Sequence, residues 1–303
     1  MTRAVISLGT NTTRLLVVRE RAGGGLDQLE HGAIGTRLGE GLHASGGLSP
    51  QAMERTLLAV RRFAERARAH GARPYAIATS AMRRAENAPE FAERMTGEIG
   101  APLQILSGEE EAAYSFRGAT GGAPSDGTRR AVLDIGGGST ECAVGINGVI
   151  EAACSIEIGS VRLTERFPDL DGHVQGDAAR IAAAHARAMV AGALRELASV
   201  PPVTEVRCVA GTPLTLGAIV LHSTVDQVSG QTITRRQIDE TIDRLLDLPL
   251  ADRKAVPGML PQRADVLPAG GIIASEALAL LNADSAKLES DDLLLGFLLG
   301  VYE

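Results

Sequence analysis

Two short glycine-containing segments of the sequence align with each other position for position. The first, SLGTNTTR, begins at Ser7, and the second, DIGGGSTE, begins 127 positions later at Asp134. Each follows a short apolar run and leads into another, a pattern typical of strand, tight turn and strand. A chain of 303 residues that repeats this hairpin is expected to fold into two α/β domains.

Both turns have residue types that suit anion binding. Glycine allows positive φ and has no Cβ, so successive backbone N–H groups can converge on a phosphate. The glycines concerned are Gly9, Gly136, Gly137 and Gly138, and nearby hydroxyls are those of Thr10, Thr12, Thr13, Ser139 and Thr140. The alternative is that each segment is an ordinary glycine-rich hairpin turn. Together, the two turns predict a phosphate clamp.

The two common phosphate-binding motifs are absent from the sequence. The only lysines are Lys254 and Lys287, and neither belongs to a G-x-x-x-x-G-K-[ST] loop. The residues after Gly138 favour a strand, whereas the dinucleotide-binding fingerprint opens a helix. Phosphate charge is therefore expected to be met by backbone groups, hydroxyls, arginine and a metal ion.

Composition favours a soluble cytoplasmic protein. The net charge of −7 argues against nucleic-acid binding, and no apolar run is long enough to suggest membrane insertion or secretion. Cys142, Cys154 and Cys208 lack C-x-x-C spacing, so they are expected to be buried thiols in a reducing compartment rather than disulfides or zinc ligands.

The first half of the sequence predicts an α/β domain. Ser49, Pro50 and Gly71 mark the start and the end of an amphipathic helix. The segments that follow predict a strand from Tyr75, a helix over 87–95, a strand from Leu103 and a helix from Glu109. The glycine-, proline- and serine-containing stretch 119–128 is interpreted as a linker between domains 1–121 and 128–303.

The second half repeats the hairpin and adds helices. The pattern predicts a long helix from Asp177 to about Val200, and a strand from Glu205. Thr234 and Gln237 form a capping-box pattern before the next helix. The apolar segment from Asp291 needs burial, which packing back across the first domain would provide.

Six acidic or basic residues are candidates for chemistry. Glu109 to Glu111 follow a predicted strand, where they could be a solvated first helical turn or include a residue that orients a water molecule. Asp134 could hold Mg²⁺ or simply cap its turn. Glu141 supports a metal site only if the turn keeps it on the same face as Asp134. Arg83 could bind phosphate or lie in solvent.

Several longer strings resemble the exopolyphosphatase and guanosine pentaphosphate phosphohydrolase (Ppx/GppA) family. They occur in order along essentially the whole chain. The strings are LGTNTTRLLV, RLGEGL, ATSAMRRAENAPEF, ILSGEEEAAYSFRGA, VLDIGGGSTE, GSVRLTERF, VAGTPLTLGAI and PGMLPQRADVLPAG.

The resemblance implies the acetate/sugar kinase, heat-shock protein and actin-like fold, with two ribonuclease-H-like domains and an active-site cleft between them. It implies hydrolysis of terminal phosphates with Mg²⁺, and a homodimer. The general base falls on Glu111, and metal binding on Asp134 with Glu141 nearby. Phosphate contacts fall on Gly9, Thr10, Asn11, Thr12, Arg83, Gly136, Gly137, Gly138 and Ser139, and Gly211 and Thr212 belong to a third loop.

One position departs from the family pattern. Ser7 stands where the family's first motif has an aspartate, so Asp134 and Glu141 are expected to carry the metal. The preferred function is exopolyphosphatase, because the chain has no room for the extra domains of longer relatives. Hydrolysis of guanosine pentaphosphate to the tetraphosphate is the alternative, and the serine also motivates a third hypothesis, a relative that binds phosphate without catalysis.

Overall fold

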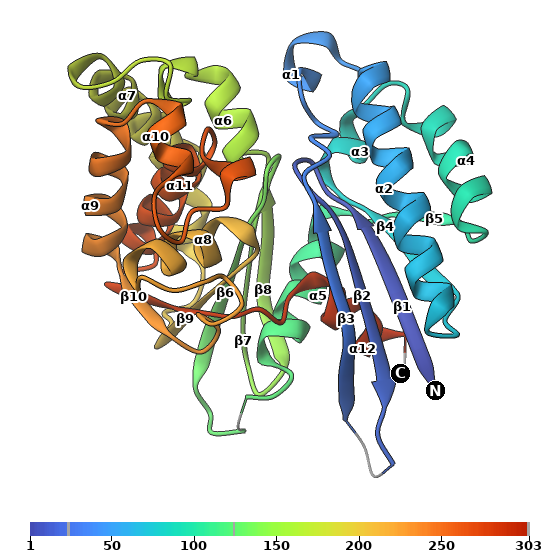
Figure 1. Ribbon diagram of the computed structural model, residues 1–303. Coiled ribbons are helices and arrows are strands. Elements are labelled where there is room, and N and C mark those ends of the chain that lie inside the picture. Colours follow the sequence, from blue (N-terminus) through green and yellow to red (C-terminus); the bar gives the residue numbers. More distant parts are fainter. Residues whose placement is uncertain (23–24, 124, 302–303) are drawn as a thin grey trace. The chain divides into compact units, whose positions relative to one another are not determined.

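The computed structural model describes residues 1–22, 25–123 and 125–301, which form two compact units (Figure 1). Unit 1 comprises Met1–Glu111 together with the described residues from Phe297 onwards, and unit 2 comprises Ala112–Gly296. The chain passes from one unit to the other within two helices, α5 (Gly108–Thr120) and α12 (Leu293–Gly300). The domain limits expected from the sequence, 1–121 and 128–303, stay a prediction.

Unit 1 contains a mixed sheet in the order β3-β2-β1-β4-β5. The strands β1, β2 and β3 are antiparallel neighbours, whereas β4 and β5 run parallel to β1. Their bounds are β1 Thr2–Leu8, β2 Thr13–Glu20, β3 Leu26–Ile34, β4 Pro74–Ala78 and β5 Leu103–Ile105. The helices before α5 are α1 Leu42–Ser45, α2 Pro50–Ala69, α3 Ser80–Arg84 and α4 Ala88–Ile99.

The core of unit 1 lies between one face of this sheet and α2, α3 and α4 (Figure 1). The start of α2 confirms its sequence signals: Ser49 accepts a hydrogen bond from Ala52 N, and Pro50 is the first helical residue. Phe63 on α2 is fully buried in this core. At the chain's end, the Phe297 ring packs edge-on against Tyr75, with centroids 5.8 Å apart.

Unit 2 repeats the same topology with one additional edge strand. Its sheet has the order β10-β11-β9-β6-β7-β8, with β6, β7 and β8 antiparallel and β9 and β11 in the parallel half. The strands are β6 Arg129–Ile135, β7 Thr140–Ile146, β8 Val149–Ile156, β9 Glu205–Val209, β10 Thr232–Thr234 and β11 Ser285–Leu288. The order β8-β7-β6-β9-β11 thus corresponds to β3-β2-β1-β4-β5 of unit 1.

Helices cover both faces of the second sheet. The helix α5 packs Ala112, Phe116 and Ala119 against one face, and the larger core lies on the other face, around the almost wholly buried α11. The helices are α6 Ser160–Arg166, α7 Asp177–Ala193, α8 Gly211–Val220, α9 Arg235–Leu246, α10 Leu250–Lys254 and α11 Leu267–Leu280, and the 3₁₀ turns are Pro168–Leu170, Arg195–Ser199 and Pro261–Arg263.

The helix predicted to run from Asp177 to about Val200 is shorter in the structure. The α-helix α7 ends at Ala193, and a 3₁₀ turn continues to Ser199. Gly192 weakens the last turn of the helix, and two prolines follow Val200. The capping box at the start of α9 is confirmed, because Thr234 and Gln237 exchange both side-chain hydrogen bonds.

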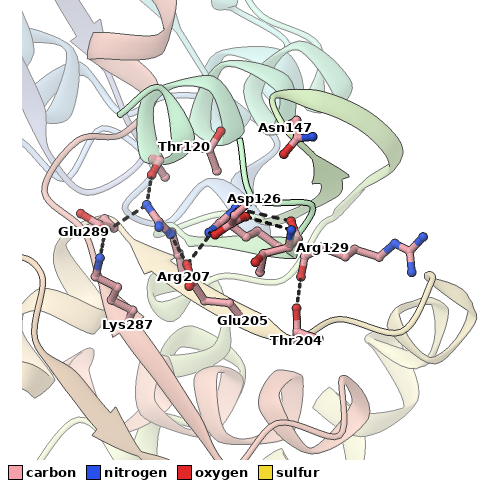
Figure 2. Close-up of polar contacts among 12 residues, drawn as sticks. Thr120, Asp126, Arg129, Asn147, Thr204, Glu205, Arg207, Lys287 and Glu289 are labelled. Atoms are coloured by element: carbon pink, nitrogen blue, oxygen red, sulfur yellow. Dashed lines mark hydrogen bonds and ion pairs between the residues drawn. The ribbon is translucent and has the colours of Figure 1, made fainter. Parts of the chain in front are cut away.

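A network of charged residues holds the C-terminal end of α5 against the sheet of unit 2. Arg207 on β9 donates to the Ala119 carbonyl oxygen at 2.6 Å and to Glu205 Oε1 at 2.5 Å. Its guanidinium also lies 3.2 Å from Glu289. Figure 2 shows Arg207 among these groups, with Lys287 beside Glu289. Such pairing satisfies arginines that would otherwise be costly to bury.

Candidate functional site

The two glycine-containing turns have the same backbone hydrogen bond. Gly9 N donates to Thr12 O and Gly136 N donates to Ser139 O, both at 3.1 Å. The flanking strands keep matching register, because Leu8 pairs with Thr13 and Ile135 pairs with Thr140. The repeated segments of the sequence therefore form the same tight hairpin in each unit.

The backbone groups at the tips of the turns suit anion binding. Within the described part of the chain, the N–H groups of Asn11, Gly137 and Gly138 donate no hydrogen bond to another backbone group. The carbonyl oxygens of Asn11 and Gly137 do accept such bonds, from Arg37 N and from Val161 N. The carbonyl oxygens thus hold the turns in place, and the three N–H groups are available to bind a ligand.

The side chain of Asn11 adds a second observation. This residue is 4% exposed, and neither its amide nitrogen nor its amide oxygen has a hydrogen-bond partner among residues 1–22, 25–123 and 125–301. Buried polar groups without partners are rare in folded proteins, and each calls for a specific explanation. A phosphate group bound at the first turn would supply an acceptor for this amide.

The second turn is seated on the start of α6. Ser160 N and Val161 N donate to the carbonyl oxygens of Gly136 and Gly137 at 2.9 Å. This approach requires Gly159, since a Cβ there would lie 2.4 Å from the carbonyl carbon of Gly137. The first residue of the GSVRLTERF string is therefore a glycine for a steric reason.

Asp134 and Glu141 are direct cross-strand partners on β6 and β7. Directly opposed residues point to the same face of a sheet. Glu141 therefore lies on the same face as Asp134, which is the condition for both residues to support one metal site. Both residues are buried. Ser115 of α5 donates to Asp134 Oδ2 at 2.6 Å, and Ser155 of β8 donates to Glu141 Oε1 at 2.7 Å.

This carboxylate pair has ligand chemistry that fits Mg²⁺. Magnesium prefers oxygen ligands and is usually held by one or two carboxylates, with water completing its shell. A cluster of three or more metal-ligating side chains does not occur among the described residues. A metal bound by Asp134 and Glu141 would therefore depend on water and substrate oxygens for its other ligands.

The corresponding strand positions in unit 1 have the opposite charge. Ser7 on β1 pairs with Arg14 on β2, at the places that Asp134 and Glu141 occupy in unit 2. A serine and an arginine replace two carboxylates, so the replacement involves the whole pair and not Ser7 alone. The first turn has a cationic side chain on its strands where the second has two anionic ones.

The three consecutive glutamates at the start of α5 have different surroundings. Glu110 accepts a hydrogen bond from Ser107 N at 2.7 Å, while Ser107 Oγ accepts one from Glu110 N at 3.1 Å. This reciprocal pair is a capping box. Glu111 is instead buried, at 6% exposure, and Arg83 Nη1 donates to its Oε2 at 2.6 Å.

Arg83 follows β4 and also donates to the Leu106 carbonyl oxygen at 3.0 Å. It thereby links α3 to the segment between β5 and α5. The strands β1, β4 and β5 run parallel, so the first turn, Arg83 and Glu111 all follow strand ends at the same edge of the unit 1 sheet. The sequence predicted these residues but not the Arg83 to Glu111 ion pair.

The third predicted loop lies at the equivalent edge of unit 2. Asp134 pairs with Val209 on the parallel strand β9, and α8 begins two residues later at Gly211. Ala210 has φ 76° and ψ 178°, a strained region that is essentially reserved for glycine and concentrates at functional sites. A Cβ on Gly211 would collide with the guanidinium of Arg263. Thr212 is buried beside Gly270.

Three residues beside the candidate site were missed from the sequence: Arg14, Ser115 and Arg263. Ser115 stands four positions after Glu111, so both lie on one face of α5, and that spacing was the available signal. Arg14 stands 127 positions before Glu141 and could have been found from the repeat. Nothing local to Arg263 in the sequence indicated its contact with Gly211.

The family model of the Ppx/GppA phosphatase family matches residues 16–294 of the chain. The chain belongs to this family. It is 34% identical over 288 residues to exopolyphosphatase 2 of Mycobacterium tuberculosis, which covers 90% of this chain and 88% of that protein.

Solved structures of family members have the same fold. An exopolyphosphatase-like protein superposes with a TM-score of 0.88 at 29% identity, covering 99% of this chain and 98% of that one. The Ppx/GppA family member of Aquifex aeolicus gives a TM-score of 0.80 at 26% identity, covering 100% and 97%. The predicted fold class, α/β with two ribonuclease-H-like domains, is confirmed by these structures and by the two matching sheet orders.

None of the described helices is long and apolar enough to cross a membrane.

Proposed function

We propose that this Ppx/GppA protein is an exopolyphosphatase, which hydrolyses the terminal phosphate of inorganic polyphosphate. The observation that supports phosphate binding most directly is the matched pair of turns, in which Asn11, Gly137 and Gly138 have backbone N–H groups without a backbone acceptor in the described part of the chain. The name of the Mycobacterium tuberculosis relative supports the choice of polyphosphate.

In the proposed reaction, a water molecule attacks the terminal phosphoryl group in line with the leaving phosphate. Glu111 orients this water and accepts its proton. Support comes from its burial and from the hydrogen bond of 2.6 Å that fixes its carboxylate against Arg83. A carboxylate held in one rotamer loses less entropy when it orients water for attack.

The two turns are proposed to bind phosphoryl oxygens, through Gly9 to Thr12 in one and Gly136 to Ser139 in the other. Backbone N–H groups that already point at a ligand need no reorganisation during the reaction. Gly211, Thr212 and Arg83 are proposed to add phosphate contacts. The orphaned amide of Asn11 is expected to gain its partner from the substrate.

Asp134 and Glu141 are the residues proposed to hold Mg²⁺. When bound, the ion offsets negative charge on the phosphate oxygens. Ser115 and Ser155 orient the two carboxylates, since each donates one short hydrogen bond. Unit 1 has Ser7 and Arg14 at the equivalent strand positions, so its turn is proposed to use arginine for the same electrostatic purpose.

The test is release of orthophosphate from polyphosphate and from guanosine pentaphosphate, each with Mg²⁺. We expect release from polyphosphate, and a loss of about 10²- to 10⁴-fold in Glu111→Gln, the usual contribution of a general base. Glu110→Gln is the matched control, because glutamine also serves in a capping box. Full activity of Glu111→Gln would refute the proposed base.

The substrate comparison separates the remaining hypotheses. Faster turnover of guanosine pentaphosphate would favour the alarmone phosphohydrolase. Binding of polyphosphate without release from either substrate would favour the non-catalytic relative that the Ser7 and Arg14 pair also allows. A cytoplasmic location and a homodimer remain predictions.

A further inference from the structure

Two of the three cysteines face each other across neighbouring strands. Cys142 on β7 and Cys154 on β8 are direct partners in an antiparallel ladder. Opposed residues in such a ladder have Cα atoms about 4.5–5.5 Å apart, and disulfides join residues whose Cα atoms are about 4.4–6.8 Å apart. Directly opposed residues point to the same face of a sheet, so the two thiols lie side by side on one face of β7 and β8.

The two thiols differ in exposure. Cys142 is buried, whereas Cys154 is half-buried. The neighbouring Cys142 side chain lowers the pKa of Cys154, against burial and the charge of Glu196, which both act to raise that pKa. Cys142 packs in the larger core of unit 2. Cys154 is thus the accessible nucleophile of the pair, and Cys142 is its buried neighbour.

We propose that Cys142 and Cys154 are a redox-active pair, which a peroxide converts reversibly into a cross-strand disulfide. The thiolate of Cys154 attacks one oxygen of hydrogen peroxide, which breaks the O–O bond and gives a sulfenic acid and hydroxide. The thiol of Cys142 then attacks the sulfenic sulfur, forming the S–S bond and releasing water. Two electrons pass from the two sulfurs to the peroxide, and a dithiol reductant returns them.

The position of the pair places this chemistry next to the carboxylates. The adjacent rung of the ladder joins Glu141 to Ser155, which donates to the Glu141 carboxylate at 2.7 Å. Successive residues on a strand point to opposite faces, so the cysteines lie on the core face and Glu141 on the other. A bond between Cys142 and Cys154 fixes β7 to β8 one residue away from Glu141.

Cys208 provides an internal control. Cys208 on β9 and Cys142 on β7 both pair with Leu133 on β6, which therefore lies between them. Burial and the charge of Asp134 raise the pKa of Cys208 to about 12. A thiol this buried and this weakly acidic is expected to stay reduced when Cys154 reacts.

The test treats the folded wild-type protein with hydrogen peroxide and maps its peptides by mass spectrometry. We expect the peptides that contain Cys142 and Cys154 to be joined by a disulfide, with loss of two hydrogen atoms. Cys208 is expected to remain a free thiol, and dithiothreitol is expected to restore the starting mass. Cys154→Ser is expected to slow oxidation of Cys142 at least about tenfold. Cys142→Ser is expected to stop at a sulfenic acid that dimedone captures.

Other results overturn the proposal. Free thiols at both positions after peroxide treatment of the folded protein would show that the pair is not redox-active. A disulfide that includes Cys208, or a stable sulfenic acid in the wild type, would show that Cys142 does not resolve Cys154. The wild-type mapping needs no variant, so the test stands even if a serine variant folds poorly.

Discussion

Ser115 on α5 donates a hydrogen bond of 2.6 Å to Asp134 at the end of β6. Both residues are buried, and Asp134 is paired in turn with Glu141. The helix α5, which contains Glu111, therefore also orients the candidate metal ligand of unit 2. Glu111 and Ser115 are four residues apart, one turn of the same helix.

Replacing Ser115 by alanine should weaken both stability and metal binding. Loss of a hydrogen bond to a buried charged group is expected to cost about 1–3 kcal/mol of unfolding free energy. We also expect a higher Mg²⁺ concentration for half-maximal phosphate release. Urea unfolding and a Mg²⁺ titration check the two effects, with Ser155→Ala as a matched variant beside Glu141. An unchanged Mg²⁺ requirement in both variants would count against these carboxylates as metal ligands.

Removing Arg83 should leave Glu111 as a buried charge without its guanidinium donor. The side chains of this ion pair are 16% and 9% exposed, and breaking a buried pair by deleting one partner costs about 3–5 kcal/mol. We therefore expect Arg83→Met to be destabilised by several kcal/mol in urea unfolding. The exposed neighbour Arg84 is the control, and Arg84→Met should change stability by less than about 0.5 kcal/mol.

The ion pair also allows a double-mutant test. If Arg83 is costly to lose because Glu111 stays charged, the double variant Arg83→Met/Glu111→Gln should recover part of the lost stability. Additive losses from the two single changes would mean that the contact contributes little.

Two glycine substitutions should have opposite signs. Gly159→Ala places a Cβ 2.4 Å from the backbone of Gly137, so we expect a loss of about 1–3 kcal/mol, as overpacking usually costs. Gly97 lies inside α4, and no atom would approach its Cβ within 4 Å. Gly97→Ala is expected to stabilise by about 0.5–1 kcal/mol through helix propensity. Thermal or urea unfolding measures both, and a neutral Gly159→Ala would contradict the close seating of the second turn.

The charged network at the end of α5 should make unit 2 acid-sensitive. Burial acts to raise the pKa of Glu205, but the hydrogen bond from Arg207 and the charges of Arg207 and Arg130 outweigh it and leave that pKa below 4.5. A carboxyl group whose pKa is lowered on folding contributes stability above its unfolded pKa, and this is lost as the pH falls through the folded value. The difference in unfolding free energy between wild type and Glu205→Gln should therefore shrink below pH 4.5. A constant difference at all pH values would contradict the assignment.

Cys208 should report on global opening of unit 2. Its pKa is raised to about 12 by burial and by the charge of Asp134, so the folded protein has almost no thiolate there at neutral pH. Alkylation of Cys208 by iodoacetamide should track the unfolded fraction through a urea titration, while Cys154 reacts in the folded state. Rapid alkylation of Cys208 without denaturant would show that the core beneath β9 opens locally.

Much of the fold was predictable because its signals are local. The repeated turn, the Ser49 cap and the capping box of Thr234 and Gln237 each depend on residues close together in the chain. The predicted length of α7 was wrong, since local propensity does not show where a helix gives way to a 3₁₀ turn. The roles of the three glutamates could not be separated by sequence, because Glu110 bonds to its own helix start and Glu111 to an arginine 28 positions away.

The order of residue types along the chain was enough to determine two similar α/β units, two matching glycine-containing turns and the family, because hydrophobic period and turn chemistry act over a few residues. Side-chain pairings across neighbouring strands needed the folded chain. Strand register places Asp134 opposite Glu141, puts Arg14 opposite Ser7 and brings Cys142 to Cys154. Register depends on how whole strands bury one face, so these pairings are a property of the tertiary structure.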